Sequence, residues 1–379
     1  MNSLQINNRV SFGGYNARAL KGVVMRNSIG FDMSKIASQM SAIGDKHGFD
    51  VICESRLADK KPCKNPSFLR KILNAITGEN LEYDHPWVQD ILYFTKDKML
   101  IEKPEGINHQ RLCEMFHIGR KDVPFRDFIS GGNLFLLQDG DAQKILMGSS
   151  EKYGKARGLF KKSDITVLPQ ADFHIDLFVR PLKNNVVIVA DDNMTLSMLE
   201  AAKDKLESFM HQGKKDWLDK IYKKLCTIIK NMRSARESGN FADTDEVIST
   251  LQRNGYEVVR TAGRIYHDRV SRFNVHGYLI HKLNFINAVA ATDKNGEIVY
   301  ISNKTNLLEE LGLTPKLAQE LGLDFESKFK DSVKEYIKPE NIYFIEGADK
   351  ADPIIYDNIA QILEKCHGGI HCLCAEIPA

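Results

Sequence analysis

Three stretches of the chain share one pattern, in which a short turn joins two apolar runs. They are residues 131–150 (GGNLFLLQDGDAQKILMGSS), 173–190 (FHIDLFVRPLKNNVVIVA) and 284–302 (NFINAVAATDKNGEIVYIS). The turns fall at QDGD, LKNN and DKNG. Asp-Gly and Asn-Gly between apolar runs are strong hairpin signals, because glycine reaches the positive φ angles of a tight turn. The sequence therefore predicts three β-hairpins.

Helical and strand signals lie between and around these hairpins. Residues 33–47 and 352–365 carry apolar side chains at three- and four-residue spacing, which indicates amphipathic helices. Residues 49–54 and 342–347 are strand-like. The order hairpin, helix, strand recurs over about 50–70 residues, a scale typical of units arranged around an axis. The predicted fold class is mixed α/β, built from hairpins rather than from one continuous parallel sheet.

The composition is that of a globular chain with enough apolar residues to form a core. Of 379 residues, 43% are hydrophobic and 27% are charged, and the formal net charge is +2. This balance gives no electrostatic reason to expect nucleic-acid binding. No window reaches the roughly eighteen apolar residues of a membrane span, and the N-terminal residues lack the layout of a secretory signal.

Seven cysteines are scattered along the chain, at positions 53, 63, 113, 226, 366, 372 and 374. An odd number in a long chain is unlike a disulfide framework, and a cytoplasmic protein with mostly inert thiols fits better. We expect an N-terminal tail at residues 1–20 and a single domain at residues 21–379, with a helical insert at about 195–250. The sequence is compatible with a homo-oligomer.

The expected insert contains two amphipathic helices, at residues 196–210 and 217–232. In the second, the apolar stripe is expected to contain Trp217, Ile221, Leu225, Ile228 and Met232. Between positions 203 and 236 there are ten Lys and Arg residues against four Asp and Glu residues. A solvated basic face is the favoured interpretation, and a docking face for an acidic partner or a membrane surface is the alternative.

The segment DFHIDLFV places a histidine and a carboxylate two residues apart. If the segment is a strand, Phe173, Ile175 and Leu177 lie on one face, and His174 and Asp176 lie on the other. One interpretation is a core histidine satisfied by its neighbour. The other is a general acid/base histidine beside a carboxylate that binds a cationic substrate.

A second carboxylate follows an aromatic residue in HPWVQD. Asp90 lies three residues after Trp87, just before the apolar run ILYF. Asp90 is either a turn or capping residue, or a group that holds a planar cation beside the aromatic ring.

The C-terminal stretch CHGGIHCLCAEIPA concentrates thiols and imidazoles in nine residues: Cys366, His367, His371, Cys372 and Cys374. A structural zinc site usually takes its ligands from two separated clusters, and no second cluster exists upstream, so zinc is disfavoured. A nucleophile at Cys372 fits better, because the two glycines allow a tight turn and close approach of a ligand. Such a thiol is useful only as a thiolate and needs positive charge nearby.

Taken together, these motifs resemble the pentein superfamily of guanidino-group-modifying enzymes. Asp90 in WVQD, the H-x-D pair and the near-terminal Cys372 occur in the order typical of that superfamily. The ending GGIHCLCAEIP is similar to that of agmatine deiminases, whereas WVQD and the basic helical insert are similar to protein-arginine deiminases. The stretch GGNLFLL is similar to a hairpin common to the superfamily. The motifs span about residues 85–379.

This resemblance implies a five-bladed α/β propeller of repeated ββαβ units. It also implies that Asp90 and Asp176 hold a guanidinium by charge-assisted hydrogen bonds. Cys372 would attack the guanidinium carbon, and His174 would act first as acid and then as base. Ammonia would leave, and hydrolysis of a covalent thiouronium would give a ureido product. No cofactor or metal is implied.

The residues expected to bind substrate are Trp87, Gly132, Asn133, Arg180 and Arg264. The two arginines could meet a substrate carboxylate, although a surface ion pair is the favoured interpretation of each. The expected substrate is agmatine, an arginine derivative or the arginine side chain of a protein.

Some positions depart from the superfamily pattern. Many relatives carry an acidic residue just before the glycines of the second repeat, whereas this chain has Ser130, with Asp127 three residues earlier. The ending CAEIP differs from that of agmatine deiminases, and no acidic cluster matches the calcium sites of vertebrate protein-arginine deiminases, so calcium is not expected.

Rival functions use some of the same residues. An amidinotransferase or dihydrolase of the superfamily would share the catalytic set, and a non-catalytic pentein would act as a binding module. A papain-like protease is disfavoured, because its cysteine precedes its histidine and opens a long helix, whereas Cys372 lies close to the C-terminus.

Overall fold

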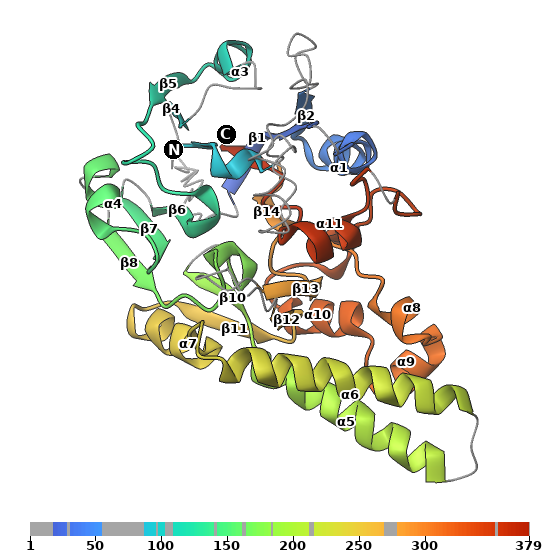
Figure 1. Cartoon of the computed structure of the whole chain (residues 1–379). Coiled ribbons are helices and arrows are strands. Elements are labelled where there is room, and N and C mark those ends of the chain that lie inside the picture. Colours follow the sequence, from blue (N-terminus) through green and yellow to red (C-terminus); the bar gives the residue numbers. More distant parts are fainter. Residues whose placement is uncertain are drawn as a thin grey trace, which may run out of the picture.

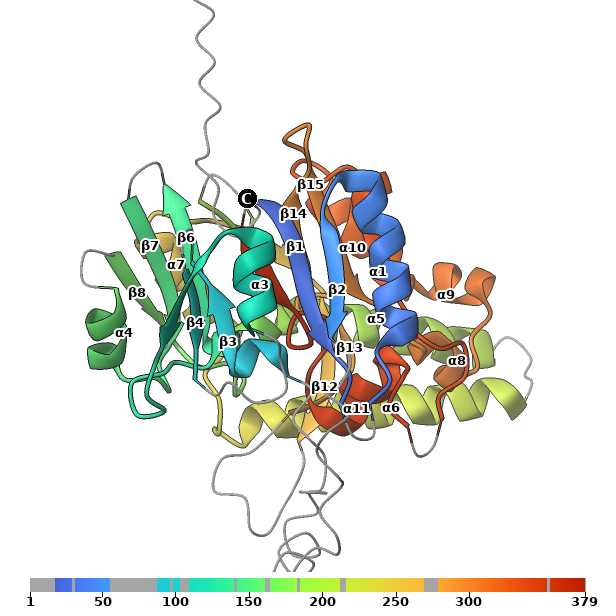
Figure 2. The ribbon, with the colours of Figure 1, turned by 90° about the horizontal axis from the view of Figure 1, so that it is seen from above.

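Figures 1 and 2 show the computed structural model of the chain. The structure describes residues 18–28, 31–54, 87–95, 98–102, 109–139, 142–160, 164–182, 185–211, 216–268, 279–352 and 355–378. Most of the tail expected at residues 1–20 lies outside these ranges, and the described chain begins in a strand at Arg18.

The strands are β1 (Arg18–Arg26), β2 (Asp50–Glu54), β3 (Leu92–Phe94), β4 (Lys98–Ile101), β5 (Gly119–Asp122), β6 (Leu134–Asp139), β7 (Ala142–Gly148), β8 (Asp164–Leu168), β9 (Val179–Pro181), β10 (Val186–Ala190), β11 (Glu257–Thr261), β12 (Arg264–Asp268), β13 (Leu279–Asn284), β14 (Val289–Thr292), β15 (Ile298–Asn303), β16 (Ile342–Ile345) and β17 (Ala375–Pro378). The α-helices are α1 (Ser34–His47), α3 (His109–Phe116), α4 (Tyr153–Leu159), α5 (Asp192–His211), α6 (Asp216–Glu237), α7 (Thr244–Arg253), α8 (Leu307–Leu311), α9 (Pro315–Leu321), α10 (Phe325–Val333) and α11 (Ile359–Cys366). Short 3-10 helices are η1 (Val88–Asp90), η2 (Gly131–Asn133), η3 (Ile175–Leu177) and η4 (Pro339–Asn341). The predicted mixed α/β class is confirmed.

One strand pattern recurs five times in the described part of the chain. In each unit two strands pair antiparallel, and the second of them also pairs in parallel with a third strand. The units are β17-β1-β2, β3-β4-β5, β6-β7-β8, β9-β10-β11 and β14-β15-β16. A parallel neighbour needs a crossover connection, and helices supply it in every unit.

The first of these units joins the two ends of the described chain. β17 pairs antiparallel with β1, from Leu20 opposite Pro378 to Val24 opposite Ala375. β1 also pairs in parallel with β14 through Arg18 and Ala291. Figure 2 shows the C-terminal end beside β1, and in Figure 1 the elements succeed one another around the molecule from β1 through β6–β8 to β10 and β11. The pairing of β17 fixes the segment that precedes it, which contains Cys372.

Two of the predicted hairpins are confirmed in position. β6 pairs with β7, and β14 pairs with β15. The tip of the first turn, at residues 140–141, lies outside the described residues. Helix α1 and strand β2 also lie where the sequence predicts them, whereas α11 begins at Ile359, seven residues later than predicted.

The third hairpin needs a correction at its start. Its strands are β9 and β10, so the chain from Phe173 to Phe178 is not a strand. His174 is extended, and the next three residues form the 3-10 helix η3. Ile175, Asp176 and Leu177 are all fully buried, so apolar and polar side chains do not alternate between two faces. Asn133 holds the backbone on both sides of His174, a tertiary contact that an alternating pattern does not reveal.

The expected helical insert contains α5, α6 and α7, between β10 and β11. The buried stripe of α6 consists of Leu218, Ile221, Leu225, Ile229 and Met232. Trp217 was expected in this stripe and is instead 43% exposed, while Ile228 is only partly buried. Leu218 and Ile229 thus take the places expected for Trp217 and Ile228, and the buried face keeps a three- and four-residue spacing.

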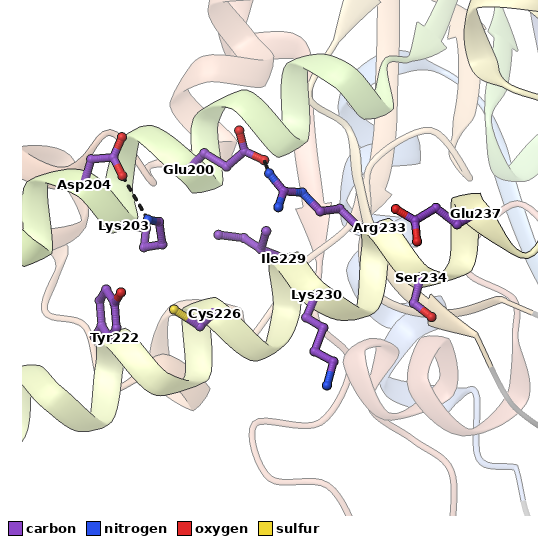
Figure 3. Close-up of a pocket in the computed structure, with 10 residues that line it drawn as sticks. All are labelled: Glu200, Lys203, Asp204, Tyr222, Cys226, Ile229, Lys230, Arg233, Ser234 and Glu237. Atoms are coloured by element: carbon purple, nitrogen blue, oxygen red, sulfur yellow. Dashed lines mark hydrogen bonds and ion pairs between the residues drawn. The ribbon is translucent and has the colours of Figure 1, made fainter.

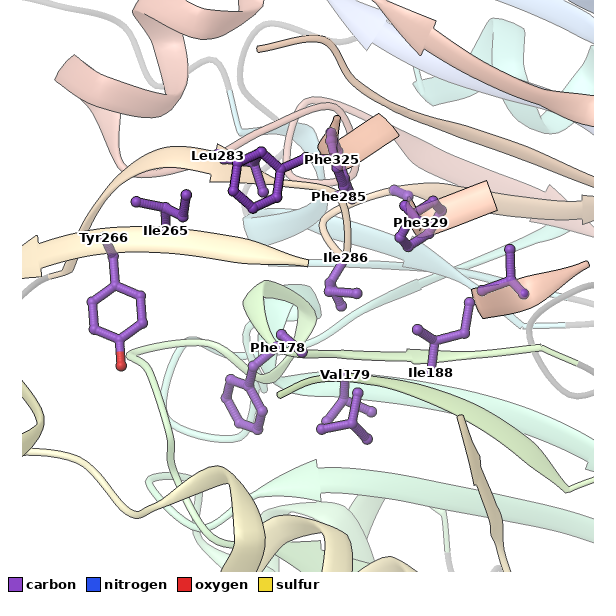
Figure 4. Packing of buried hydrophobic residues seen from close by; sticks show 14 of the residues in the cluster. Phe178, Val179, Ile188, Ile265, Tyr266, Leu283, Phe285, Ile286, Phe325 and Phe329 are labelled. Carbon is purple, nitrogen blue, oxygen red and sulfur yellow. The ribbon is translucent and has the colours of Figure 1, made fainter. Parts of the chain in front are cut away.

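A large apolar cluster connects these helices to the strands beneath them. Figure 4 shows Phe178, Phe285 and Phe329 within it, and the ring centroids of the last two are 5.3 Å apart. Phe178 follows η3 directly, so this cluster anchors the segment that carries Asp176. Among the described helices, none has the length and apolar character needed to cross a membrane.

Candidate active site

The C-terminal turn brings Cys372 into the interior. Helix α11 ends at Cys366; the next residue, His367, has a φ of +63°, and two glycines follow. A Cβ on Gly368 would lie 2.9 Å from the ring of Trp87 and 3.2 Å from Cβ of Cys372. A Cβ on Gly369 would lie 2.5 Å from the side-chain amide of Asn303. Only glycine fits such close approaches, which supplies the reason for GGIHC.

Two asparagines hold this turn by hydrogen bonds. Asn287 Oδ1 accepts from the backbone N–H groups of Gly369 and His371, at 3.1 Å each, and its Nδ2 lies 3.1 Å from Cys372 Sγ. Asn303 Oδ1 accepts from Ile370 N at 2.8 Å, and its Nδ2 donates to Asn287 O at 2.9 Å. Sequence analysis missed both asparagines, because they lie more than sixty residues from the turn and no local pattern connects them.

Asp176 lies against the thiol of Cys372. Its carboxylate is fully buried, and Oδ2 is 3.3 Å from Cys372 Sγ and 2.8 Å from His371 Nδ1. The other oxygen, Oδ1, is buried and has no hydrogen-bond partner among the described residues. Buried carboxylate oxygens are normally satisfied, so this atom is one to which a ligand could donate.

The protein environment disfavours negative charge on both groups. Burial is the main cause that raises the pKa of Asp176 well above its usual value, and the nearby charge of Asp90 adds to it. Burial also raises the pKa of the Cys372 thiol well above its usual value, and the negative charges of Asp176 and Asp90 add to it. A bound cation would reverse these effects, because it stabilises each anionic form.

Asp90 and His174 form a second cluster, linked by Ser130. The Ser130 hydroxyl donates to Asp90 Oδ1 at 2.5 Å and lies 3.1 Å from His174 Nε2. His174 Nδ1 lies 3.9 Å from Asp90 Oδ1. The side chains of Asp90 and His174 are 24% and 14% exposed, so this cluster is closer to solvent than Asp176. Ser130 therefore occupies the place beside His174 where the superfamily pattern predicts an acidic residue.

Gly132 and Asn133 shape the position of His174. A Cβ on Gly132 would lie 2.3 Å from His174 Nδ1. Asn133 Nδ2 donates to Phe173 O at 3.3 Å, and its Oδ1 accepts from Ile175 N at 3.1 Å. Both residues were expected to bind substrate. In the structure Asn133 is buried, and its side chain forms hydrogen bonds to the backbone on both sides of His174.

Arg180 and Arg264 both lie in ion pairs, but these pairs are buried rather than on the surface as expected. Arg180 is 0% exposed, pairs with Glu376 on β17 and stacks over the Phe135 ring at 5.5 Å. Arg264 is 1% exposed. Its Nε and one terminal nitrogen each donate to a different carboxylate oxygen of Asp192, at 2.8 Å. Each guanidinium thus already has a carboxylate partner within the protein.

His371 and Gln89 are site residues that sequence analysis did not select. His371 lies between Asp176 on one side and Gln89, whose Nε2 is 3.1 Å from His371 Nε2, on the other. Both belong to quoted motifs, GGIHC and WVQD, so their neighbours Cys372 and Asp90 were the available signal.

The remaining residues of the C-terminal cluster point elsewhere. Cys374 Sγ lies 3.9 Å from Met40 Sδ, and burial raises the pKa of Cys366 to about 12. In the described part of the chain, no group of three His, Cys, Asp or Glu side chains is placed to hold a metal ion.

An open groove of about 660 Å³ lies elsewhere, between α5 and α6. Figure 3 shows its lining, which includes Glu200, Lys203, Tyr222 and Arg233. It contains none of the candidate catalytic residues, and Arg233–Glu200 and Lys203–Asp204 form ion pairs within its lining.

No family model matches the chain, and no curated protein is similar to it in sequence. Among solved structures it is similar to agmatine deiminase of C. jejuni, with a TM-score of 0.49 and 11% identity over 96% of this chain and 95% of that one. Agmatine deiminase of Enterococcus faecalis has a TM-score of 0.48 and 10% identity, over 97% and 96% of the two chains. DDAH from Pseudomonas aeruginosa, a cysteine-to-serine mutant complexed with citrulline, has a TM-score of 0.28 and 11% identity, over 64% and 92%.

These proteins are members of the superfamily that the motifs resemble. Since all three TM-scores are below 0.5, the function of this chain has to be argued from its own side chains.

Proposed function

We propose that this protein hydrolyses a guanidino group to a ureido group and releases ammonia. One observation carries the proposal: the fully buried carboxylate of Asp176 touches the Cys372 thiol with one oxygen, while its other oxygen has no partner among the described residues. An unpaired buried carboxylate is unfavourable unless a cation with N–H donors completes it. A guanidinium supplies both the positive charge and a planar set of donors.

Binding of the substrate would also activate the thiol. The cation offsets the charges of Asp176 and Asp90, which otherwise hold Cys372 protonated. The thiol then loses its proton to His174, and the thiolate attacks the guanidinium carbon, which becomes tetrahedral. His174 delivers a proton to one amino group, the carbon–nitrogen bond breaks, and ammonia leaves a thiouronium on Cys372.

The second half of the reaction restores the enzyme. His174 accepts a proton from water, whose oxygen attacks the thiouronium carbon. The carbon–sulfur bond then breaks and leaves the ureido product and the cysteine. In sum, one guanidinium and one water give one ureido group and one ammonium ion, with no external oxidant or reductant.

The proposed substrates are agmatine, an arginine derivative and a protein-bound arginine. Agmatine is named in two of the similar structures and citrulline in the third, which supports a panel of these guanidines. An amidinotransferase would use the same groups but pass the amidino group to an amine instead of water, and product analysis separates the two.

We also propose that the five strand units are the blades of a five-bladed propeller and that the chain from residue 21 to 379 is one domain. The repeated pairing and the closure of β1 by β17 support this arrangement. Helices α5–α7 would then be an insert within the fourth unit. That the protein is cytoplasmic and that it forms a homo-oligomer remain predictions from the sequence.

The test is ammonia release by purified protein from arginine, agmatine and an arginyl peptide, with Cys372→Ser as the control. We expect release from one class of substrate and none from the control. Amidino transfer to an added amine without ammonia release would favour the transferase. No ammonia release from any of the three substrates by folded, reduced protein would contradict the hydrolase.

A further inference from the structure

Each of the two histidines at the site has one ring nitrogen within hydrogen-bonding distance of an uncharged polar side chain. From these contacts we infer that Gln89 and Ser130 hold the histidines in opposite neutral tautomers, with the proton on Nδ1 in His371 and on Nε2 in His174. The inference rests on the proposed function for its catalytic meaning, but the tautomers themselves are measurable without any activity.

For His371 the argument starts at the carboxylate. Oδ2 of Asp176 lies 2.8 Å from His371 Nδ1. When a bound guanidinium keeps Asp176 ionised, its carboxylate can only accept, so Nδ1 carries a proton. Burial is the main cause that lowers the pKa of His371 well below its usual value, with Arg180 and His174 adding to it, so the ring is neutral. Nε2 is then a lone pair, and the amide Nε2 of Gln89 donates to it at 3.1 Å.

A protonated Asp176 would invert this arrangement. The carboxyl group would donate to Nδ1, the ring proton would move to Nε2, and the amide of Gln89 would turn its oxygen toward the ring. The tautomer of His371 therefore also reports whether Asp176 is ionised. Because the proposed reaction needs the ionised form, the Nδ1–H tautomer is the one expected with a guanidinium bound.

For His174 the argument starts at the serine hydroxyl. Ser130 has one hydroxyl proton, and it is donated to Asp90 Oδ1 at 2.5 Å. Toward His174 the hydroxyl oxygen can then only accept, so Nε2, at 3.1 Å, is the donor. This leaves the lone pair of the neutral ring on Nδ1. That atom makes no hydrogen bond within the described residues; it lies 3.9 Å from Asp90 Oδ1 and packs against Gly132, where a Cβ would be 2.3 Å from it.

The opposite tautomers give the histidines different tasks. His174 Nδ1 makes no hydrogen bond within the described residues, so this is the atom that would take and return a proton. His371 keeps its proton on the bond to Asp176, which holds Oδ2 and leaves Oδ1 for the substrate. Gln89 and Asp90 are neighbours in η1, so this short helix contributes to both clusters. Ser130 and Gln89 are positioning residues in this scheme, because each acts through a histidine.

The direct test is NMR of the full-length protein with ¹⁵N-labelled histidine, using long-range nitrogen–proton correlations. His174→Gln and His371→Gln variants assign the two rings. With millimolar guanidinium chloride as the probe cation at neutral pH, we expect Nδ1–H for His371 and Nε2–H for His174. The inference is overturned by the other tautomer in either ring, or by double protonation of either histidine.

Two variants test the assigned partners. Ser130→Ala should change only the His174 signals and lower kcat about tenfold, the effect of one lost hydrogen bond, while Ser130→Thr, which keeps a hydroxyl, should recover much of it. Gln89→Leu should change only the His371 signals. Signals that stay unchanged in both variants would contradict the inference. Absent ammonia release together with the expected tautomers would contradict the proposed function and leave the inference standing.

Discussion

At the scale of single residues, the site is organised around charge that the protein itself does not neutralise. Asp176 is fully buried, and Arg180, a buried cation whose charge acts on it, already pairs with Glu376. Buried carboxylates of this kind are retained for binding or catalysis at the expense of stability. Two consequences of the raised pKa values can be measured separately.

The first concerns folding. Because the pKa of Asp176 is raised in the folded state, the fold binds a proton there more tightly than the unfolded chain does. The contribution of Asp176 to stability is therefore full at low pH and falls as pH rises from about 4 toward neutrality. Asp176→Asn has no such proton to lose. We predict that the free energy of unfolding of the variant in urea, relative to that of wild type, increases between pH 4.5 and 7.5. Its rate of ammonia release should fall at least about 100-fold. A free energy of unfolding of Asp176→Asn that falls relative to that of wild type as pH rises would contradict the assigned pKa direction.

The second concerns the thiol. Asp176 raises the pKa of Cys372 by its charge, so its removal should increase the thiolate fraction. We predict that iodoacetamide labels Cys372 faster in Asp176→Asn than in wild type at pH 8, although the variant is catalytically impaired. Mass spectrometry of the peptide that contains Cys372 gives the rate, and Cys366, whose pKa is raised by burial, is an internal reference. Equal or slower labelling of Cys372 in the variant would contradict this account.

At the scale of elements, short turns rather than long strands place the proposed catalytic groups. η1 carries Asp90, η2 adjoins Ser130, and η3 carries Asp176, while the turn after α11 carries Cys372. Glycines allow these turns to pack closely, since Cβ atoms on Gly132 and Gly368 would overlap His174 and Trp87.

Substitution of one such glycine provides a matched experiment. Gly132→Ala should displace the His174 ring, because the new Cβ would lie 2.3 Å from Nδ1. We predict a loss of ammonia release of about 100-fold or more, as expected when a reacting group is misplaced by an ångström. Gly158→Ala in α4 is the control, because a Cβ there meets nothing within 4 Å. It should keep full activity and add up to about 1 kcal/mol of stability. Equal activity of both variants would contradict the packing role of Gly132.

The same turns mark the limit of what the sequence alone reveals. Asp-Gly and Asn-Gly turns are local signals, so the hairpins at 131–150 and 284–302 were predictable. The start at Phe173 was not, because Asn133, forty residues away, holds the backbone around His174. Asn287 and Asn303 were missed for the same reason.

At the scale of the whole molecule, the last strand completes the first unit and carries a charge into the core. Glu376 on β17 pairs with Arg180, which is fully buried and two of whose donors, Nε and Nη1, have no partner among the described residues. β17 thus connects the C-terminal end both to β1 and to the region beside the active site.

Removal of the carboxylate from this pair should lower the stability of the whole fold. We predict that Glu376→Gln lowers the free energy of unfolding by about 3 kcal/mol or more, because it leaves a buried guanidinium without its counter-charge. Asp219→Asn breaks the exposed Lys223–Asp219 pair on α6 and should change it by less than about 1 kcal/mol. Denaturant unfolding of both variants gives the comparison, and equal effects would show that the Arg180 pair is not strongly coupled to stability.

The most direct measurement of the central claim is intact-protein mass spectrometry after acid quenching during turnover of arginine, agmatine and an arginyl peptide. The account predicts, for the substrate that releases ammonia, an adduct on Cys372 with the mass of the substrate minus ammonia, and no adduct in Cys372→Ser. Ammonia release that persists in Cys372→Ser would contradict a covalent role for this cysteine.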